Sequence, residues 1–132
     1  MSSEPRTVTV NVLVTRSREI DEPDWCVGHR ADRANFLADV THNGPETSAT
    51  FETATGTVTF LAAWITQAPY GTIRPEPLPV LAVEVDGDAV SMEPETVRAF
   101  TAAARARLDE LDALADDVER LRLNAPGAAG EA

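Results

Sequence analysis

Valine residues alternate with mostly polar residues along the segment Thr7–Thr15, which reads TVTVNVLVT. An alternation with a period of two places every second side chain on the same face of a strand, and β-branched residues favour strands. The segment therefore predicts a half-buried strand. The next segment, Arg16–Asp24, contains four acidic residues and a proline, and it predicts a loop.

Two short segments and one long apolar segment predict further strands. We expect the short strands at Phe36–His42 and Ala49–Ala54, each followed closely by a glycine that favours a turn. The longer segment Thr57–Thr66 has apolar residues on both faces, which predicts a central strand. A short helix over Leu61–Gln67 is the alternative, because its leucine and alanine residues favour helices.

The segment Ala68–Pro79 holds four of the nine prolines and predicts an extended connection. Val80–Val85 predicts a strand, and Asp86-Gly87-Asp88 predicts a hairpin turn. We expect the return strand at Ala89–Met92. Residues 7–92 thus predict a small, mainly antiparallel sheet of about five or six short strands.

A long helix is expected after the sheet, since neither glycine nor proline occurs between Pro94 and Pro126. It should run from about residue 93 to about residue 123, a length of about 45 Å. The fold class predicted is therefore α+β, with this helix packed on the sheet in a single domain of residues 1–123. Residues 124–132 lack apolar periodicity and predict a disordered tail.

One side of this helix carries apolar residues at alternating spacings of three and four. In order, these positions are Val97, Phe100, Ala104, Arg107, Leu111, Leu114, Val118 and Leu121, of which only Arg107 is not apolar. We expect the first half to pack on the sheet. Strands of five or six residues span only about 17–20 Å, so the second half should extend beyond them. The predicted interface, for a second copy or another protein partner, is Leu111, Leu114, Val118 and Leu121.

Charge excludes several classes of partner. The 132 residues include 22 acidic residues against 11 arginines and no lysine, for a net charge of −11. A protein with this negative charge repels phosphate backbones and anionic lipids, so we expect no nucleic-acid or membrane partner. No apolar run approaches the roughly 20 residues that span a bilayer. The first six residues lack the apolar core of a signal peptide, which predicts a cytoplasmic location.

The only cysteine and both histidines lie between residues 26 and 42. Cys26 and His29 are separated by two residues, as are Asp39 and His42. Zinc prefers thiolate and imidazole donors and accepts a carboxylate as a further ligand. These residues therefore predict a zinc site made of Cys26, His29 and His42, with Asp39 or water as the fourth ligand.

Two other interpretations of the same residues stay open. Cys26 would serve as a small buried apolar residue beside Trp25, with both histidines exposed in loops. Alternatively, Cys26 would be a nucleophile with a histidine base, although no group that would stabilise an oxyanion is apparent. Motifs for paired catalytic carboxylates, a phosphate loop or a serine triad are absent, so no catalytic residue is assigned.

Three runs of residues resemble a family of small, uncharacterised actinobacterial proteins of the Streptomyces type, a domain of unknown function. The runs are Glu22–His29 (EPDWCVGH), Asp39–Pro45 (DVTHNGP) and Ser91–Glu95 (SMEPE), the last of which opens an alanine-rich helix. The resemblance covers about residues 8–123, and the Trp-Cys-x2-His element is its most specific part. It implies that the matching positions here are Trp25, Cys26, His29, His42 and Gly44. It also implies a cytoplasmic protein, and no activity.

The leading hypothesis from the sequence is a non-enzymatic protein-interaction or regulatory domain. It would self-associate or dock a partner through the C-terminal helix, and a structural zinc ion would be held near the loop before the second strand. The alternative is a small metal- or thiol-dependent enzyme that uses the cluster of Cys26, His29 and His42.

Overall fold

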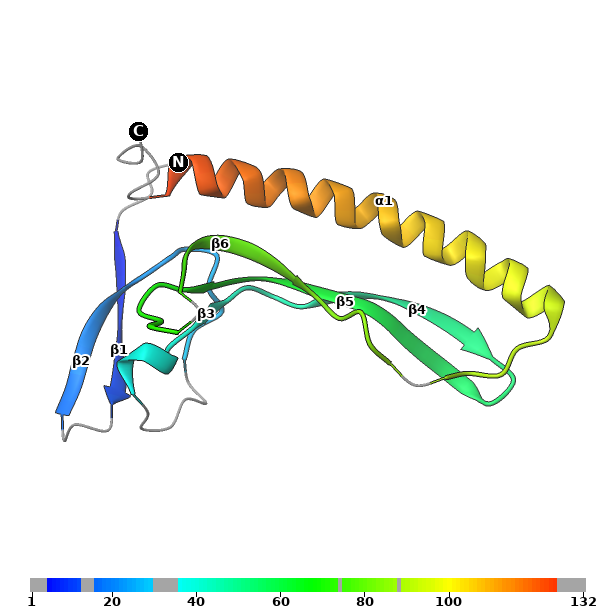
Figure 1. Ribbon diagram of the computed structural model, residues 1–132, viewed down its shortest axis with the longest axis horizontal. Helices are drawn as coiled ribbons and strands as arrows, with labels where there is room; N and C mark the ends of the chain where they lie inside the picture. The colour runs from blue at the N-terminus through cyan, green and yellow to red at the C-terminus, as the bar shows by residue number, and fades with distance from the viewer. Residues whose placement is uncertain (1–4, 13–15, 30–35, 74, 88, 126–132) are drawn as a thin grey trace.

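The computed structural model describes residues 5–12, 16–29, 36–73, 75–87 and 89–125. It confirms the predicted α+β class, with two antiparallel sheets and one long helix (Figure 1). In chain order the elements are β1 (Arg6–Val12), β2 (Arg16–Glu22), the 3-10 helix η1 (Leu37–Asp39), β3 (His42–Asn43), β4 (Thr47–Thr53), β5 (Gly56–Ala68), β6 (Glu76–Val83) and α1 (Pro94–Asn124). The described part of the chain contains no helix with the length and apolar character needed to cross a bilayer.

Strand β5 is the centre of the larger sheet and pairs antiparallel with β3, β4 and β6. Ala63 pairs with Thr47 of β4 and with Val83 of β6, so these two strands lie on opposite edges of β5. The prediction of a central strand at Thr57–Thr66 is confirmed, and the alternative helix over Leu61–Gln67 is wrong. Strand β5 has neighbouring strands at both edges, as expected of a central strand.

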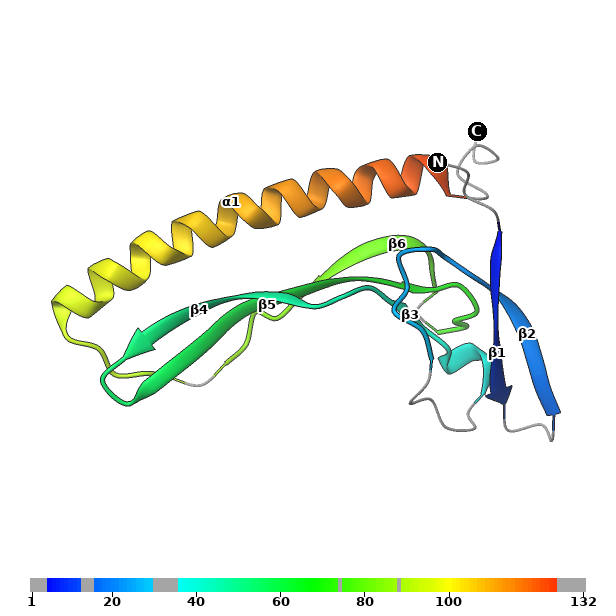
Figure 2. The ribbon, with the colours of Figure 1, turned by 180° about the vertical axis from the view of Figure 1, so that it is seen from behind.

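Helix α1 lies along the length of this sheet and covers one face of it (Figures 1 and 2). Near its beginning, the Phe100 ring packs on Phe51 of β4 and Phe60 of β5, with ring centroids 5.6 and 4.9 Å apart. The first half of the helix therefore packs as expected. The apolar contacts explain why the helix follows the sheet, because they remove aromatic surface from water.

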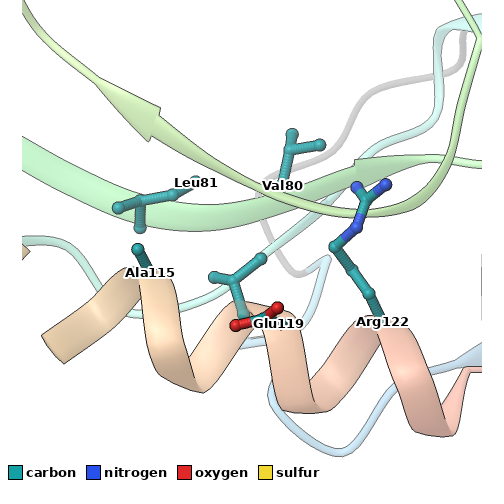
Figure 3. A pocket seen from close by; sticks show the side chains of 6 residues that line it. Val80, Leu81, Ala115, Glu119 and Arg122 are labelled. Atoms are coloured by element: carbon teal, nitrogen blue, oxygen red, sulfur yellow. The ribbon is translucent and has the colours of Figure 1, made fainter. Parts of the chain in front are cut away.

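The second half of α1 also lies over the sheet, on β6. The expectation of strands only five or six residues long is wrong for β5, which has 13 residues. At about 3.3 Å per residue it spans about 43 Å, close to the length of the helix. Val118 is consequently buried at 6% exposure. Arg122, whose side chain extends toward β6 in Figure 3, donates from Nη1 to the Pro79 carbonyl at 3.0 Å.

Arg107, which interrupts the apolar stripe, is the most deeply buried charged side chain of the described residues, at 1% exposure. It reaches a β-bulge, where the pairing of β4 and β5 shifts register between Thr47 and Ala49. Leu61 in this bulge has a φ of +48°. Arg107 donates to the Leu61 carbonyl from Nε (3.1 Å) and Nη2 (2.9 Å), and from Nη2 to the Thr47 carbonyl at 3.1 Å. The guanidinium thus supplies hydrogen-bond donors to two backbone carbonyls at the bulge, where the regular strand pairing is interrupted.

The predicted loop at Arg16–Asp24 is wrong, because its first seven residues form β2 and pair with β1. Its single apolar residue, Ile20, lies opposite Val8 and is buried, while acidic residues occupy other positions. The predicted strand at Phe36–His42 is also wrong. This segment forms η1 and then only the first residue of the two-residue β3, because β4 already occupies most of that edge of β5.

The connection predicted at Ala68–Pro79 is shorter than expected, since β6 begins at Glu76 and includes Pro77 and Pro79. Among the described strands, β6 pairs with β5 alone and so lies at an edge of the sheet, where proline is tolerated. The predicted return strand at Ala89–Met92 is wrong, because these residues carry the chain from β6 to the start of α1 (Figure 1). Asp88 and residues 126–132 of the predicted tail lie outside the described residues.

Strands β1 and β2 form a separate two-stranded hairpin at the end of the molecule where α1 ends (Figures 1 and 2). Val10 and Ile20 of this hairpin pack with Val40 in a small buried core. Three partly buried residues surround that core, namely Val8, Leu37 and Tyr70. Because a lone hairpin is only marginally stable in water, side-chain contacts with the rest of the chain must hold it in place.

Candidate metal centre

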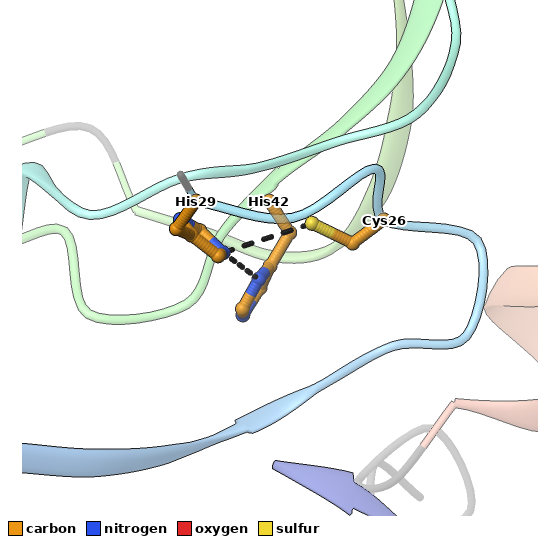
Figure 4. Close-up of side chains that lie close together, drawn as sticks. All are labelled: Cys26, His29 and His42. Carbon is orange, nitrogen blue, oxygen red and sulfur yellow. Dashed lines mark hydrogen bonds between the residues drawn. The ribbon is translucent and has the colours of Figure 1, made fainter. Parts of the chain in front are cut away.

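Cys26, His29 and His42 converge beside the hairpin, as their spacing predicted (Figure 4). His29 Nε2 lies 3.6 Å from Cys26 Sγ and 3.3 Å from His42 Nδ1. The imidazole rings meet edge to face, with centroids 5.3 Å apart. The donor atoms of all three residues lie within 4.8 Å of one another, so they are close enough to bind one ion together.

The loop after β2 positions Cys26 and His29. Its backbone is tied to β3 by a hydrogen bond from the Val27 amide to the Asn43 carbonyl at 2.9 Å. Gly28 has a φ of +102°, a conformation that other residues rarely adopt, and its amide donates to Cys26 Sγ at 3.4 Å. The turn therefore brings the His29 ring back to the sulfur of Cys26, which lies three residues earlier in the sequence.

His42 comes from the sheet itself. It pairs with Gln67 of β5, which fixes its backbone in the larger sheet. Two residues later, Gly44 donates to the Ile65 carbonyl at 2.8 Å, and a Cβ at this position would lie 3.4 Å from the Trp25 carbonyl. The small residue lets the cysteine loop approach the sheet closely, which brings Cys26 within reach of His42.

These separations match the edges of a tetrahedral zinc site. With Zn–N bonds of about 2.0–2.1 Å and Zn–S bonds of about 2.3 Å, two nitrogens lie about 3.3–3.4 Å apart and sulfur and nitrogen about 3.6 Å apart. The observed distances are 3.3 Å between His29 Nε2 and His42 Nδ1, and 3.6 Å between His29 Nε2 and Cys26 Sγ. Two of the three edges therefore already have the required length.

Burial raises the pKa of the Cys26 thiol above its ordinary value of 9.0, and the nearby Glu22 carboxylate adds to this effect. Hydrogen bonds from the backbone at Gly28 and Asn43 act in the opposite direction. Since the thiolate is the nucleophile, the raised pKa disfavours a reactive cysteine in the metal-free protein. A cation at the sulfur would reverse this preference by stabilising the thiolate.

Burial also lowers the pKa of His42 below 6.5, and the neighbouring His29 adds to this effect. The Glu22 charge and a hydrogen bond to the backbone of Asp21 oppose it. A neutral imidazole is the form that binds a metal. The environment of His42 thus favours the ligand form, and the interpretation of both histidines as exposed loop residues is wrong, because His42 is 2% exposed.

The predicted fourth ligand, Asp39, is not part of this group. It lies in η1 with an exposed side chain. A different carboxylate is at the site, that of Glu22 at the end of β2, whose Oε1 lies 3.9 Å from His29 Nε2. Sequence reasoning missed Glu22 because its segment resembled a loop. In a strand, Ile20 and Glu22 lie on the same face, because side chains two residues apart point in the same direction. Ile20 is buried, so this face points inward and carries Glu22 with it.

Arg6 of β1 is the second residue that the sequence did not indicate. Its Nε lies 3.0 Å from Glu22 Oε2, and its Nη2 donates to the carbonyls of Pro23 (2.8 Å) and Cys26 (2.9 Å). One arginine therefore holds both the buried carboxylate and the loop that carries the cysteine.

Comparison with curated proteins and with solved structures yields no match. A family model does match, and it covers residues 7–120, which include the whole Cys-His-His group and most of α1. Its description is "Domain of unknown function (DUF6907)". Because the match extends over most of the sequence, this chain belongs to the DUF6907 family.

Proposed function

We propose that this protein is a zinc-binding domain in which Cys26, His29 and His42 hold a structural ion. The observation that carries the proposal is the convergence of three good zinc donors, two of whose separations fit a tetrahedron. His29 comes from a loop and His42 from a sheet strand, 13 residues later in the sequence. An ion bound by them would fix the loop to the larger sheet.

Burial favours a structural role over the alternative of a metal- or thiol-dependent enzyme. A catalytic zinc ion keeps one position open to water or substrate, whereas a structural ion is enclosed by protein ligands. Cys26 is 6% exposed, His42 is 2% exposed, and the His29 side chain is 4% exposed. The raised pKa of Cys26 further disfavours the thiol-dependent reaction.

The test is the metal content of the untagged protein, measured by elemental analysis after exhaustive dialysis. We expect about one zinc ion per chain, as in other structural sites of this type. Cys26→Ser should lose the ion, whereas Asp39→Asn, which changes an exposed carboxylate outside the group, should keep it. A wild-type protein that binds no divalent metal when zinc is supplied would refute the proposal.

An interaction role through α1 is a second proposal. Its support is the apolar surface that the helix leaves exposed, at Val97 (44%), Leu108 (51%) and Leu123 (74%). Of the predicted interface, Leu111, Leu114 and Leu121 are half-buried and Val118 is buried. Light scattering on the full chain tests self-association. A doubled mass that Leu108→Glu returns to the monomer value would support it, and a monomer at high concentration would refute it.

The cytoplasmic location stays a prediction.

A further inference from the structure

Glu22 has a buried carboxylate oxygen that accepts no hydrogen bond of normal geometry from the described residues. The side chain is 8% exposed. Its Oε2 is paired with Arg6, but its Oε1 is fully buried and accepts no hydrogen bond. A buried carboxylate oxygen without a partner is costly, and such atoms are rare in folded proteins. The arrangement calls for a positively charged or donating group at Oε1.

The direction of this oxygen shows where such a group would lie. Oε1 is 3.9 Å from His29 Nε2. The same nitrogen lies 3.6 Å from Cys26 Sγ and 3.3 Å from His42 Nδ1. His29 Nε2 thus has three further donor atoms around it. Its distances to Cys26 and His42 equal the edges of a zinc tetrahedron, about 3.3–3.6 Å, and its distance to Glu22 is slightly longer. Glu22 lies just outside the group of atoms that are all within 4.8 Å of one another, so it would move toward the site on binding the ion.

We propose that Glu22 is the fourth ligand of the metal, so that the site is a closed set of one cysteine, two histidines and one glutamate. This inference rests on the proposed zinc-binding function and extends it. Thiolate, imidazole and carboxylate are all accepted zinc ligands. The thiolate of Cys26 and the carboxylate of Glu22 together carry two negative charges, which balance a divalent ion in a buried site.

Arg6 supports Glu22 in this role. By binding Oε2 at 3.0 Å it leaves Oε1 as the oxygen directed at the site, and it fixes the carboxylate through a charge-assisted pair. Groups that orient a ligand in this way strengthen metal binding without touching the ion. Its further bonds to the Pro23 and Cys26 carbonyls link the orientation of Glu22 to the position of the cysteine.

The position of Glu22 gives the site a specific structural consequence. Glu22 ends β2 of the hairpin, Cys26 and His29 belong to the loop that follows it, and His42 belongs to the larger sheet. A metal ion bound by all four would cross-link the two sheets. Without Glu22, the ion would tie only the loop to the larger sheet.

Titration with cobalt(II), which replaces zinc and absorbs visible light, tests this ligand set. We expect the metal-free wild-type protein to bind one cobalt ion with the intense d–d bands of a four-coordinate site and a single thiolate charge-transfer band. Glu22→Gln should bind cobalt at least about tenfold more weakly, since losses of even outer-sphere partners cost about 10–100-fold. It should also change the d–d bands. Asp39→Asn, the matched control, should behave as wild type.

A substitution that keeps a donor atom makes the test independent of how well Glu22→Gln folds. Glu22→His, whose Nε2 reaches about as far from the backbone as a glutamate oxygen, should keep the four-coordinate cobalt site with shifted d–d bands and bind cobalt more tightly than Glu22→Gln. If the d–d bands of Glu22→His are those of wild type, or if Glu22→Gln is folded and matches wild type in affinity and spectrum, Glu22 is not a ligand, while the proposed function stands. If wild type binds neither cobalt nor zinc, the proposed function and this inference both fail.

Discussion

His42 links the protonation of the metal-free protein to its stability. Burial lowers its pKa below 6.5 in the folded state. Between that lowered pKa and 6.5, the unfolded chain binds more protons than the folded chain, so stability falls as the pH drops below 6.5. One proton contributes a slope of at most about 1.4 kcal/mol per pH unit.

Urea unfolding of the chelator-treated protein between pH 5 and pH 8 measures this effect. We expect His42→Gln to remove the part of the slope that wild type shows just below pH 6.5. The difference between the two proteins isolates His42 from the carboxylates, which titrate lower. Equal slopes for both proteins would contradict the assignment.

The fourth ligand shows why single site residues are harder to predict than motifs. The chain has only one cysteine and two histidines, and all three lie close together in sequence. Their side-chain chemistry was therefore enough to identify them. Acidic residues are abundant in this chain, with 22 Asp and Glu, and proximity in sequence favoured Asp39. Which carboxylate faces the site depends on strand β2 and its pairing with β1, a tertiary contact that local sequence does not reveal.

The junction between α1 and the bulge in β5 depends on Arg107. Replacing Arg107 with Met should remove donors from the carbonyls of Leu61 and Thr47, whose hydrogen bonds to the guanidinium are partly buried. We expect a loss of about 1–3 kcal/mol in the free energy of unfolding, the cost of leaving a polar group without a partner away from water. Arg105→Met, an exposed site on the same helix, should change it by less than about 0.5 kcal/mol. Similar urea midpoints for the two variants would refute the role of Arg107.

The second half of α1 gives a matched pair of apolar residues. Val118 is 6% exposed over β6, whereas Leu123 is 74% exposed. Val118→Ala should lower the unfolding free energy by about 1–3 kcal/mol, because it removes buried apolar volume. Leu123→Ala should leave it within about 0.5 kcal/mol. Thermal unfolding of both variants checks this, and equal losses would mean that Val118 does not pack against its own sheet.

Elements with strong local patterns were predictable, and elements defined by pairing were not. The alternation of β1, the apolar run of β5 and the uninterrupted α1 carry their periodicity in sequence. Strand β2 has a single apolar residue, Ile20, and the first half of β6 contains Pro77 and Pro79, so both segments resemble loops. Only the second half of β6 was predicted, as part of a strand at Val80–Val85. Their strand conformation comes from a neighbouring strand. Arg107 was visible as a break in the stripe, but its partner, the bulge, was not.

A metal ion bound by residues of two sheets should control how firmly the hairpin is held to the rest of the molecule. Without metal, the small core of Val10, Ile20 and Val40 and the hydrogen bond between His42 and the backbone of Asp21 connect the hairpin to the rest of the chain. The ring contacts of Phe100 with the larger sheet involve none of the four ligands and need no ion. Removing zinc should therefore loosen one end of the molecule more than the other.

Hydrogen exchange measured with and without a chelator tests this difference. We expect faster exchange after zinc removal in residues 6–12, 16–29 and 42–43, and little change in β4 or in the first half of α1. Zinc at 100 times its dissociation constant should add about 2.7 kcal/mol to the unfolding free energy, and Cys26→Ser should abolish this gain. Uniformly faster exchange across the chain would show that the ion supports the whole fold. That result would contradict a cross-link confined to the hairpin end, where Glu22 and His42 belong to different sheets.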